Sequence, residues 1–536
     1  MHAHDALAQS LAALDLPLFG VVGDANAYLV DRFACTHGGR YTAAANENGA
    51  VLMALGAAMI GNTVGLATVT HGPALTNCVT ALAEAAKSNT PLVLLAGDTK
   101  RPDRENLQNI DQRQVVLAAG AGFEEMRSAA TALEDLGRAL RRAQSERRPV
   151  VFNMPADLLW EDCAAGVLHS QIPPLAPTTI GEAELNEAIG MIAAARRPLI
   201  LVGRGAVDAK DDILALARRL EAPLATTMRA KNLFADTDYA LGVCGTVSTP
   251  QAGDVIAGAD CIIAFGASLN FHTTAHGGFT RDKRVIQICD RAQDLAAHGP
   301  VDLAIWGEAG GVARTLHHWL DEAEIAPSGF TPTLPARGLD RPVITPAKGH
   351  RAGTVDFLPA LARLDAVLPQ NRNLVTDAGR WMVRSYGLLT APHPRDHVTT
   401  ASFGSIGLGM GAAIGAAVAR PDRPTVLFCG DGGFMLGNIT EFNAAVRARC
   451  DLICVVFNDG SYGAEHIQLV EKQIDPAISL FDWPELVPLA TALGGTGMVI
   501  ASEDDLARLP DVLATRDRQK PFLIDVKLDP HHVTMW

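Results

Sequence analysis

The feature of this sequence that most constrains its fold is a set of short, uninterrupted apolar segments. The clearest are VGLATVT (64–70), PLVLLAG (91–97), PLILVG (198–203), TVLFCG (425–430) and LICVVFN (452–458). A strand without alternating polar residues is buried on both faces, which is typical of parallel sheets covered by helices. Because stretches of helical length separate the segments, the pattern predicts an α/β fold.

Two proline- and glycine-rich stretches divide the chain into three blocks. HSQIPPLAPTTIGE (169–182) and a longer stretch at 329–353 have the composition of linkers. We therefore predict three doubly wound parallel-sheet domains, over residues 1–165, 181–335 and 354–536. The first and third blocks share the same style of segments, which leaves open a common fold without visible sequence similarity.

Charge and composition narrow the partners. The net charge is −14, and the sequence lacks long basic runs, which argues against nucleic acid and anionic membranes as partners. The nine cysteines show no CxxC or zinc spacing and fit the reduced thiols of a cytoplasmic protein. MHAHDALAQSLAAL has no basic n-region of a signal peptide. The charge-free segment 402–419 is rich in Gly and Ala, which favours a buried helix over a membrane span.

Two motifs follow neighbouring apolar segments in the last block. GDGG (430–433) and NDGSYG (458–463) each come where a strand should end, and open parallel sheets bind ligands at that edge. Side-chain oxygens with a turn carbonyl make a site that Mg²⁺ prefers, and phosphate oxygens can complete its shell. An N-cap Asp and an Asn-Asp-Gly turn are the alternative. The pair of motifs together favours the metal site, with Asn458 and Asp459 both candidate ligands.

Several segments, in the expected order, resemble the thiamine diphosphate (ThDP) enzymes of the acetolactate synthase, pyruvate decarboxylase and benzoylformate decarboxylase superfamily. GDG followed by Asn-Asp resembles the cofactor signature, and ENGAVLMALGAA (47–58) resembles the catalytic-glutamate helix. Residues 70–98 are similar to the GPGxxN segment, RRPLILVGRGA (196–206) to the opening of the central domain, and FGSIGLGMGAAIGAA (403–417) to the stretch before GDG. The resemblance covers nearly the whole chain.

The resemblance implies a set of cofactor contacts. Asp431, Asp459 and the Ser461 carbonyl would hold the metal, although the family usually has Asn where Asp459 stands. Ile406 would press the cofactor into a bent shape, or be an ordinary core residue. Gly432 and Gly433 would let backbone N–H groups reach the diphosphate. The implied cofactor-binding residues are Glu47, Asn77, Gly404, Ser405, Ile406, Gly430, Asp431, Gly432, Gly433, Asn458, Tyr462 and Gly463.

Glu47 is the expected catalytic acid. It lies among small apolar residues in TAAANENGAVLMALGAA, where a carboxyl group loses hydration and its pKa should rise. Such a group can hydrogen-bond the aminopyrimidine of ThDP and favour the imino tautomer that starts the chemistry. The alternative is a Glu that complements the dipole at a helix N-terminus. The resemblance favours the catalytic role.

Four further residues are candidates for proton transfer or substrate contact. Asp24 in GDAN and Glu465 in YGAEH fall where related decarboxylases carry active-site acids, or they are ordinary loop and helix-start acids. His71, before the GPxxxN turn, can act as an acid or base near neutral pH, or only stabilise the turn. Gln108 falls near a glutamine that acetolactate synthase-like enzymes place at the active site.

The resemblance implies a ThDP- and Mg²⁺-dependent lyase or carboligase that acts on a 2-oxo acid. The family resemblance implies a dimer or tetramer in which Glu47 meets Asp431 of another subunit. Flavin is not expected, because GASLNFHTTAHG replaces the flavin segment of acetolactate synthase. The alternatives are a flavin- or nicotinamide-dependent oxidoreductase, suggested by LVGRGA, and a non-catalytic ThDP-fold binding protein.

Overall fold

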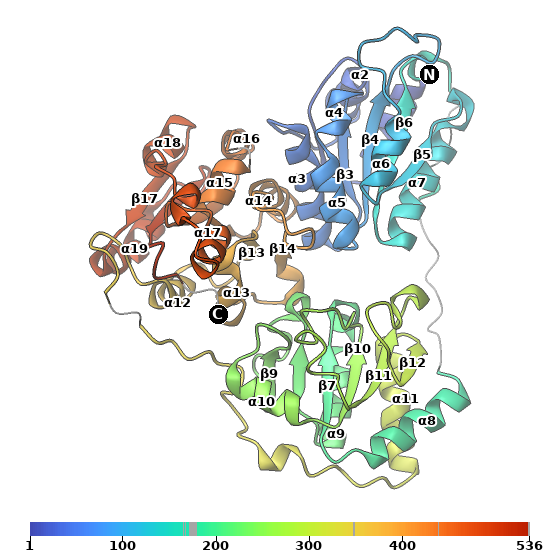
Figure 1. Ribbon diagram of the computed structural model, residues 1–536. Helices are drawn as coiled ribbons and strands as arrows, with labels where there is room; N and C mark the ends of the chain where they lie inside the picture. Colours follow the sequence, from blue (N-terminus) through green and yellow to red (C-terminus); the bar gives the residue numbers. More distant parts are fainter. Residues whose placement is uncertain (164–165, 167, 171–179, 347–348, 438, 534–536) are drawn as a thin grey trace.

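The computed structural model describes residues 1–163, 166, 168–170, 180–346, 349–437 and 439–533. The linker expected at 169–182 lies mostly outside them. The described chain forms three six-stranded sheets flanked by helices (Figure 1), and every strand pairing in these sheets is parallel. The predicted α/β class with three doubly wound parallel sheets is therefore confirmed.

The first sheet has the strand order β2-β1-β3-β4-β6-β5. Its strands are β1 (Leu18–Gly20), β2 (Tyr41–Ala43), β3 (Gly65–Val69), β4 (Leu92–Asp98), β5 (Gly122–Glu125) and β6 (Pro149–Pro155). Its helices are α1 (Ala3–Ala12), α2 (Ala27–Asp31), α3 (Glu47–Gly61), α4 (Pro73–Thr76), α5 (Val79–Lys87), α6 (Gln112–Ala118) and α7 (Ala132–Glu146).

The central sheet has the order β12-β11-β10-β7-β8-β9, which is the strand order of dinucleotide-binding folds. Its strands are β7 (Pro198–Val202), β8 (Leu224–Thr226), β9 (Ala240–Val243), β10 (Cys261–Phe265), β11 (Arg284–Cys289) and β12 (Leu303–Trp306). Its helices are α8 (Glu182–Ala194), α9 (Lys210–Leu220), α10 (Pro250–Gly258) and α11 (Ala309–Glu322).

The third sheet has the order β14-β13-β15-β16-β18-β17. Its strands are β13 (Asn373–Thr376), β14 (His397–Thr399), β15 (Thr425–Gly430), β16 (Leu452–Asn458), β17 (Thr496–Ile500) and β18 (Phe522–Lys527). Its helices are α12 (Phe357–Val367), α13 (Arg380–Leu388), α14 (Gly409–Ala419), α15 (Asp431–Leu436), α16 (Glu441–Arg447), α17 (Gly463–Glu471), α18 (Leu486–Ala492) and α19 (Glu503–Thr515). When the strands of each sheet are numbered one to six along the chain, the first and third sheets have the same spatial order, 2-1-3-4-6-5.

Helices α3 and α14 pack the first and third sheets' layers against each other. A Cβ atom on Gly56 would lie 2.0 Å from the Ala412 carbonyl oxygen, and one on Gly415 would lie 1.8 Å from the Met53 oxygen. These glycines therefore let the two backbones touch. The charge-free segment 402–419 is thus a loop followed by a buried helix. No helix in the described part of the chain has both the length and the apolar character that crossing a bilayer requires.

Candidate active site

Asp431 lies at the carboxyl edge of the third sheet. It is the first residue of α15 and is 2% exposed. One carboxylate oxygen accepts from the Gly432 N–H (2.9 Å), and the other accepts from the Gly460 N–H (2.7 Å) and the Trp483 indole N–H (3.0 Å). Burial, and then the charge of Asp459, raise the pKa of Asp431 to about 7. A cation bound here would favour the ionised form.

Asp459 follows β16 and lies beside Asp431. Its Oδ2 accepts from the guanidinium of Arg380, with 3.1 Å to Nε, and its other oxygen accepts from the Ser461 hydroxyl. Arg380 is itself buried and also donates to the Pro530 carbonyl (3.0 Å). The extra negative charge of Asp459, at a position where the family usually has Asn, is therefore matched by a buried arginine.

Asn458 does not share this arrangement. Its side-chain amide donates to Asp525 on β18 (2.9 Å). Asn458 is also not among the residues that line the cavity described next. The amide nitrogen of Asn458 is thus engaged with Asp525, and contact of the Asn458 side chain with a metal or cofactor stays a prediction. Asp459, which directly follows the same strand, does line the cavity and is the better placed candidate for the second ligand.

A cavity of about 390 Å³ joins most of the predicted residues of the third block. The predicted residues that line it are Gly404, Ile406, Gly430, Asp431, Gly432, Gly433, Asp459, Ser461, Tyr462, Gly463 and Glu465. Ser405 does not line it, and its hydroxyl donates to the Ile406 carbonyl (3.1 Å). The central domain contributes Met228, Thr246, Val247 and His272 to the wall.

Neighbouring side chains leave no room for a Cβ atom at the last two glycines of GDGG. A Cβ on Gly432 would lie 2.7 Å from the Tyr462 ring and 3.6 Å from the Ser461 carbonyl oxygen. A Cβ on Gly433 would lie 2.9 Å from Asp377 Oδ2. The absence of side chains therefore lets the turn at Ser461 approach the loop, which brings the Ser461 carbonyl close to Asp431.

Asp377 is a site residue that sequence reasoning missed. It follows β13, is fully buried, and accepts from the N–H groups of Gly407 (2.8 Å) and Leu408 (3.3 Å) and from the Thr400 hydroxyl (3.1 Å). It thereby fixes the loop that carries Gly404 and Ile406. Its only sequence signal is an acid at the end of the apolar segment NLVT. Arg380 and Trp483 were also missed, and they carried no motif.

A second group of predicted residues lies at the carboxyl edge of the first sheet. Glu47 begins α3, with Asn46 as the N-cap, and its Oε2 accepts from the Asn77 amide (3.0 Å). The Glu47 side chain is only partly buried in the single chain. The expected apolar burial of this carboxyl group is therefore wrong for the chain alone, because the small residues of α3 pack on α14 and not on Glu47.

Asp24, Thr70 and His71 form a short hydrogen-bonded chain at the same edge. The Thr70 hydroxyl donates to Asp24 (3.0 Å) and lies 3.1 Å from His71 Nδ1, which is 3.8 Å from Asp24 Oδ1. His71 is buried, whereas the Asp24 side chain is 80% exposed. Such a chain can relay a proton between solvent and the buried ring.

Gln108 is placed beside the turn that follows His71. Gly72 has a φ of +58°, and a Cβ there would lie 2.3 Å from the Gln108 carbonyl oxygen, so the contact is through backbone atoms. The side chain that holds this turn is Gln112, which sequence reasoning missed. It accepts from the Gly72 N–H (2.9 Å) and donates to the Gly97 carbonyl (2.9 Å).

Within one chain these two groups do not form a single pocket. None of Glu47, Asn77, His71, Asp24 and Gln108 is among the described residues that line the 390 Å³ cavity. The same relation to the strands holds in both groups, because Asp24 follows β1 as Asp377 follows β13, and His71 follows β3 as Asp431 follows β15. We call the first-sheet group the first half-site and the third-sheet group the second half-site.

The two half-sites lie at equivalent edges of two α/β sheets with the same strand order, and such edges are where open parallel sheets bind ligands. Comparison with models of protein families identifies the family to which this chain belongs. The N-terminal TPP binding domain of the thiamine pyrophosphate enzymes matches residues 1–115, their central domain matches 185–316, and their C-terminal TPP binding domain matches 375–526. The chain therefore belongs to the thiamine pyrophosphate enzymes, and the suspected resemblance is confirmed.

Several named relatives are similar to this chain over most of their length. A sulfoacetaldehyde acetyltransferase of Alcaligenes xylosoxydans xylosoxydans is 28% identical, over 91% of this chain and 86% of the relative. A probable acetolactate synthase large subunit of Methanocaldococcus jannaschii is 26% identical, over 90% and 85%. The large subunit of acetolactate synthase isozyme 2 of Escherichia coli is 26% identical, over 96% and 91%. All three names describe enzymes.

The glycine loop that suggested a dinucleotide site packs against the protein itself. A Cβ on Gly203 would lie 2.1 Å from the Gly266 carbonyl oxygen, and the Gly205 N–H donates to that oxygen (3.2 Å). The loop after β7 is thus filled by the loop after β10. This contact removes the physical basis for reading LVGRGA as a phosphate loop, since its close approach is to backbone.

Proposed function

We propose that this chain is a ThDP- and Mg²⁺-dependent C–C lyase or carboligase that acts on a 2-oxo acid. The observation that supports the proposal is the second half-site, where Asp431, Asp459 and Ser461 line one cavity together with the glycine loop. Such an oxygen-only donor set fits Mg²⁺ and leaves positions for phosphate oxygens. The family membership supports ThDP as the source of those oxygens.

The residues of the second half-site would hold the cofactor. Asp431 would give up a proton when the cation binds, because the pKa of the metal-free carboxyl group is about 7. Asp459 would exchange part of its contact with Arg380 for the cation. Ile406, at the cavity wall, would press on the cofactor from one side. Bound ThDP would supply the carbanion chemistry that C–C cleavage requires.

The residues of the first half-site would handle protons. Glu47 Oε2 would exchange a proton with the pyrimidine ring, and Asn77 would orient the Glu47 carboxyl group through the hydrogen bond described above. The chain of Asp24, Thr70 and His71 would carry a proton to or from the substrate carbon. Because the two half-sites of one chain do not share a cavity, we propose that the active site forms between subunits of a dimer or tetramer.

The proposal is tested by a substrate panel. Purified protein with ThDP and Mg²⁺ should release CO₂ from at least one 2-oxo acid, and an added aldehyde distinguishes carboligation from protonation. Sulfoacetaldehyde belongs in the panel because of the named relatives. Glu47→Gln should bind ThDP with little loss and lose turnover, since only proton exchange is removed. Absence of ThDP binding in calorimetry would refute the proposal.

The purified protein and its Glu47→Gln variant also test the two alternative functions, an oxidoreductase and a non-catalytic binding protein. A yellow protein with flavin absorbance would favour an oxidoreductase over the expected colourless holoenzyme. A Glu47→Gln variant that matches the wild type in every turnover assay would favour a non-catalytic binding protein, since retained binding alone needs no proton exchange at this residue.

A further inference from the structure

Glu441, the first residue of α16, reaches from the third domain into the first. It is 1% exposed and accepts from the backbone N–H groups of Ala45 (3.1 Å) and Asn46 (2.9 Å). These two residues directly precede Glu47. A Cβ on Gly49 would lie 2.0 Å from Glu441 Oε1, so the helix that begins at Glu47 is pressed against this carboxylate. Glu441 therefore fixes the backbone that starts the first half-site.

Glu84, on α5, makes the opposite connection. It is fully buried and accepts from the backbone N–H groups of Ser402 (3.0 Å) and Phe403 (2.6 Å), which lie in the third domain. These residues directly precede Gly404, with Ile406 two positions later. Glu84 therefore fixes the backbone that leads into the loop of the second half-site.

The two glutamates occupy equivalent places in the repeated fold. Helix α5 follows β3, which is the third strand of the first sheet, and α16 follows β15, which is the third strand of the third sheet. Helices α3 and α14 precede those strands and form the glycine-mediated contact between the layers. Each glutamate reaches across that contact to the loop in front of the other domain's helix.

Neither glutamate belongs to the chemistry described so far. Among the described residues, neither lines the 390 Å³ cavity, and all the bonds given above go to main-chain N–H groups. A carboxylate that accepts two such bonds in a buried place holds the backbone more strongly than a neutral acceptor. Glutamine is a poorer partner at both positions. The two N–H groups at Glu84 donate to different oxygens, one of which becomes an amide donor in glutamine. At Glu441 both N–H groups donate to Oε1, and glutamine removes the carboxylate charge and the second contact of the Ala45 N–H with Oε2.

We propose that Glu441 and Glu84 are reciprocal positioning residues: each half-site of the chain is held in place by a carboxylate from the domain that carries the other half-site. The inference about loop position stands on the contacts alone, whereas its effect on turnover rests on the proposed function. If active sites form between subunits, the two half-sites of one chain serve different active sites. The glutamates would then connect those sites through the chain.

The test is amide hydrogen exchange in the full-length, cofactor-free protein. Glu441→Gln should speed exchange in the segment 44–50 by about tenfold or more and leave 401–407 unchanged, because charge-assisted bonds are lost on one side only. Glu84→Gln should do the reverse. Glu308→Gln is the matched control: Glu308 caps α11 by accepting from Gly310 (2.7 Å) and Gly311 (2.6 Å), in the central domain.

The two variants should affect different kinetic constants: one the ThDP concentration for half-maximal activation, the other kcat. Glu84→Gln should raise the ThDP concentration for half-maximal activation, since the loop at Ile406 is loosened, with a smaller change in kcat. Glu441→Gln should mainly lower kcat, since Glu47 is displaced. A protein without ThDP activity would refute the proposed function, while the exchange experiment would still decide the positioning roles.

Several outcomes would overturn the proposal. They are equal loosening of both segments in both variants, a similar change in the Glu308→Gln control, or no change in either segment. If a glutamine variant does not fold, Glu441→Asp or Glu84→Asp replaces it, because the shorter carboxylate keeps its charge but cannot reach both N–H groups. The same one-sided change in exchange is then expected.

Discussion

At the residue scale, the charge balance of the second half-site depends on Asp459 and its partner Arg380. Burial, and then repulsion by the Asp459 carboxylate, raise the pKa of Asp431 to about 7, while Asp459 itself is paired with the Arg380 guanidinium. In the proposed site, Asp431 would have to be ionised to bind Mg²⁺. The affinity for the metal should therefore fall as the pH drops below about 7.

Asp459→Asn should move this pH dependence. Without the Asp459 charge, the second cause of the raised pKa of Asp431 disappears, so that Asp431 ionises at lower pH. We expect the midpoint of Mg²⁺ binding in the presence of ThDP, measured by calorimetry between about pH 6 and about pH 8, to shift to lower pH. Asp459→Glu keeps the charge and should keep the midpoint. An unchanged midpoint in Asp459→Asn would contradict the assigned cause.

The stability that Asp377 contributes should depend on pH in the direction opposite to that of a carboxylate whose pKa is lowered by folding. Burial raises the pKa of Asp377 to about 6, although its hydrogen bonds favour the ionised form. Between its unfolded value, 3.8, and about 6, the folded chain binds the proton and the unfolded chain does not. Stability contributed by Asp377 is therefore lost as the pH rises through this window.

Asp377→Asn should remove that loss. The variant is less stable at every pH because its amide has one acceptor oxygen, whereas the carboxyl group of Asp377 accepts from Gly407 and Leu408 with two different oxygens. Its deficit in melting temperature relative to the wild type should be larger near pH 4 than above about pH 6. Thermal melts of both proteins at a series of pH values measure this, and a deficit that grows with pH would be inconsistent with a raised pKa.

At the element scale, the contact of α3 with α14 is made by backbone atoms. Gly415→Ala would place a methyl group 1.8 Å from the Met53 carbonyl oxygen, which is a severe steric clash. We therefore expect the free energy of unfolding to fall by about 3 kcal/mol. Gly190→Ala is the matched control: Gly190 lies within α8, and nothing lies within 4 Å of its Cβ position. It should stabilise by about 0.5–1 kcal/mol. Chemical denaturation of both variants checks the contrast.

The elements also show how far the sequence alone could reach. Uninterrupted apolar segments correctly predicted the parallel strands, because burial on both faces leaves a direct mark on residue choice. Strand ends leave a weaker mark on the sequence. In the apolar stretch LPLFGVV (16–22) only Leu18–Gly20 form β1, since the chain leaves the sheet at Val21, whose carbonyl accepts from the Asn26 amide (3.1 Å). That side-chain bond has no periodic signature.

The residues of the candidate site also differ in how far the sequence could predict them. Residues in local motifs, such as Asp431 and Glu47, could be singled out because their neighbours in sequence are also their neighbours in space. Arg380, Glu84 and Glu441 could not, because each acts on a segment far away in the chain. The partial exposure of Glu47 in the single chain also depends on packing that no local pattern records.

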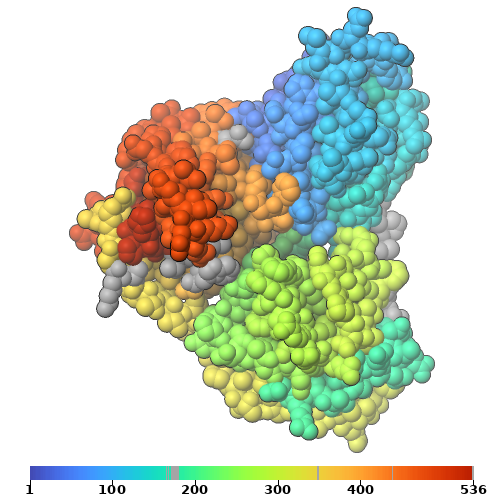
Figure 2. Space-filling view, viewed as in Figure 1, coloured from blue at the N-terminus to red at the C-terminus, as the bar shows by residue number. Residues whose placement is uncertain are grey.

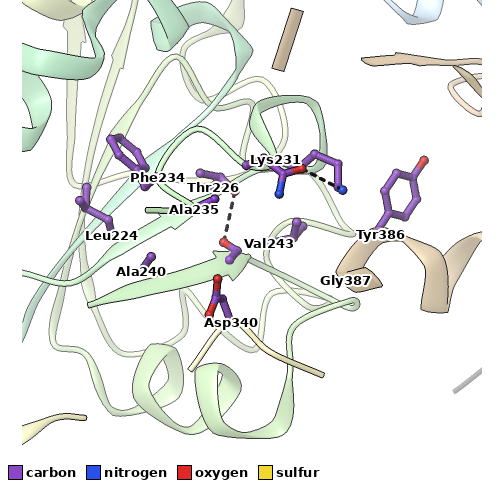
Figure 3. Close-up of a pocket in the computed structure, with 12 residues that line it drawn as sticks. Leu224, Thr226, Lys231, Phe234, Ala235, Ala240, Val243, Asp340, Tyr386 and Gly387 are labelled. Carbon is purple, nitrogen blue, oxygen red and sulfur yellow. Dashed lines mark hydrogen bonds between the residues drawn. The ribbon is translucent and has the colours of Figure 1, made fainter. Parts of the chain in front are cut away.

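At the scale of the whole molecule, the central domain is tied to both others. Figure 2 shows it against the first and third blocks. Arg204 donates to the carbonyl of Ser88 (3.0 Å) in the first domain, and Arg229 bonds the same carbonyl. Toward the third domain, Lys231 stands at a small cavity of about 60 Å³ together with Tyr386 (Figure 3) and donates to the Leu389 carbonyl. These bonds to backbone acceptors fix the relative positions of the three domains.

A divided site makes a prediction about mixed assemblies. Glu47→Gln and Asp431→Asn should each be inactive alone. If each active site combines the first half-site of one subunit with the second half-site of its partner, a mixed dimer keeps one intact site. Random mixing should then restore about a quarter of the wild-type activity, since half of the dimers are mixed and each has one good site of two.

The control for this experiment mixes two variants of the same half-site. Glu47→Gln with Asn77→Ala damages the first half-site in both chains, so every site in the mixed dimer remains defective. Activity should stay at the level of the parents. Recovery in this control, or no recovery in the first mixture after subunit exchange is verified by mass, would mean that the sites are not shared.

The backbone contact between α3 and α14 has a consequence for engineering. Gly56 and Gly415 bring α3 and α14 together through main-chain atoms, so this contact between the first and third domains does not depend on large side chains. Met228, Val247 and His272 line the cavity from the central domain and take no part in that contact. A library that diversifies these three residues should therefore alter the cavity wall while the two cofactor-binding domains stay docked in each chain.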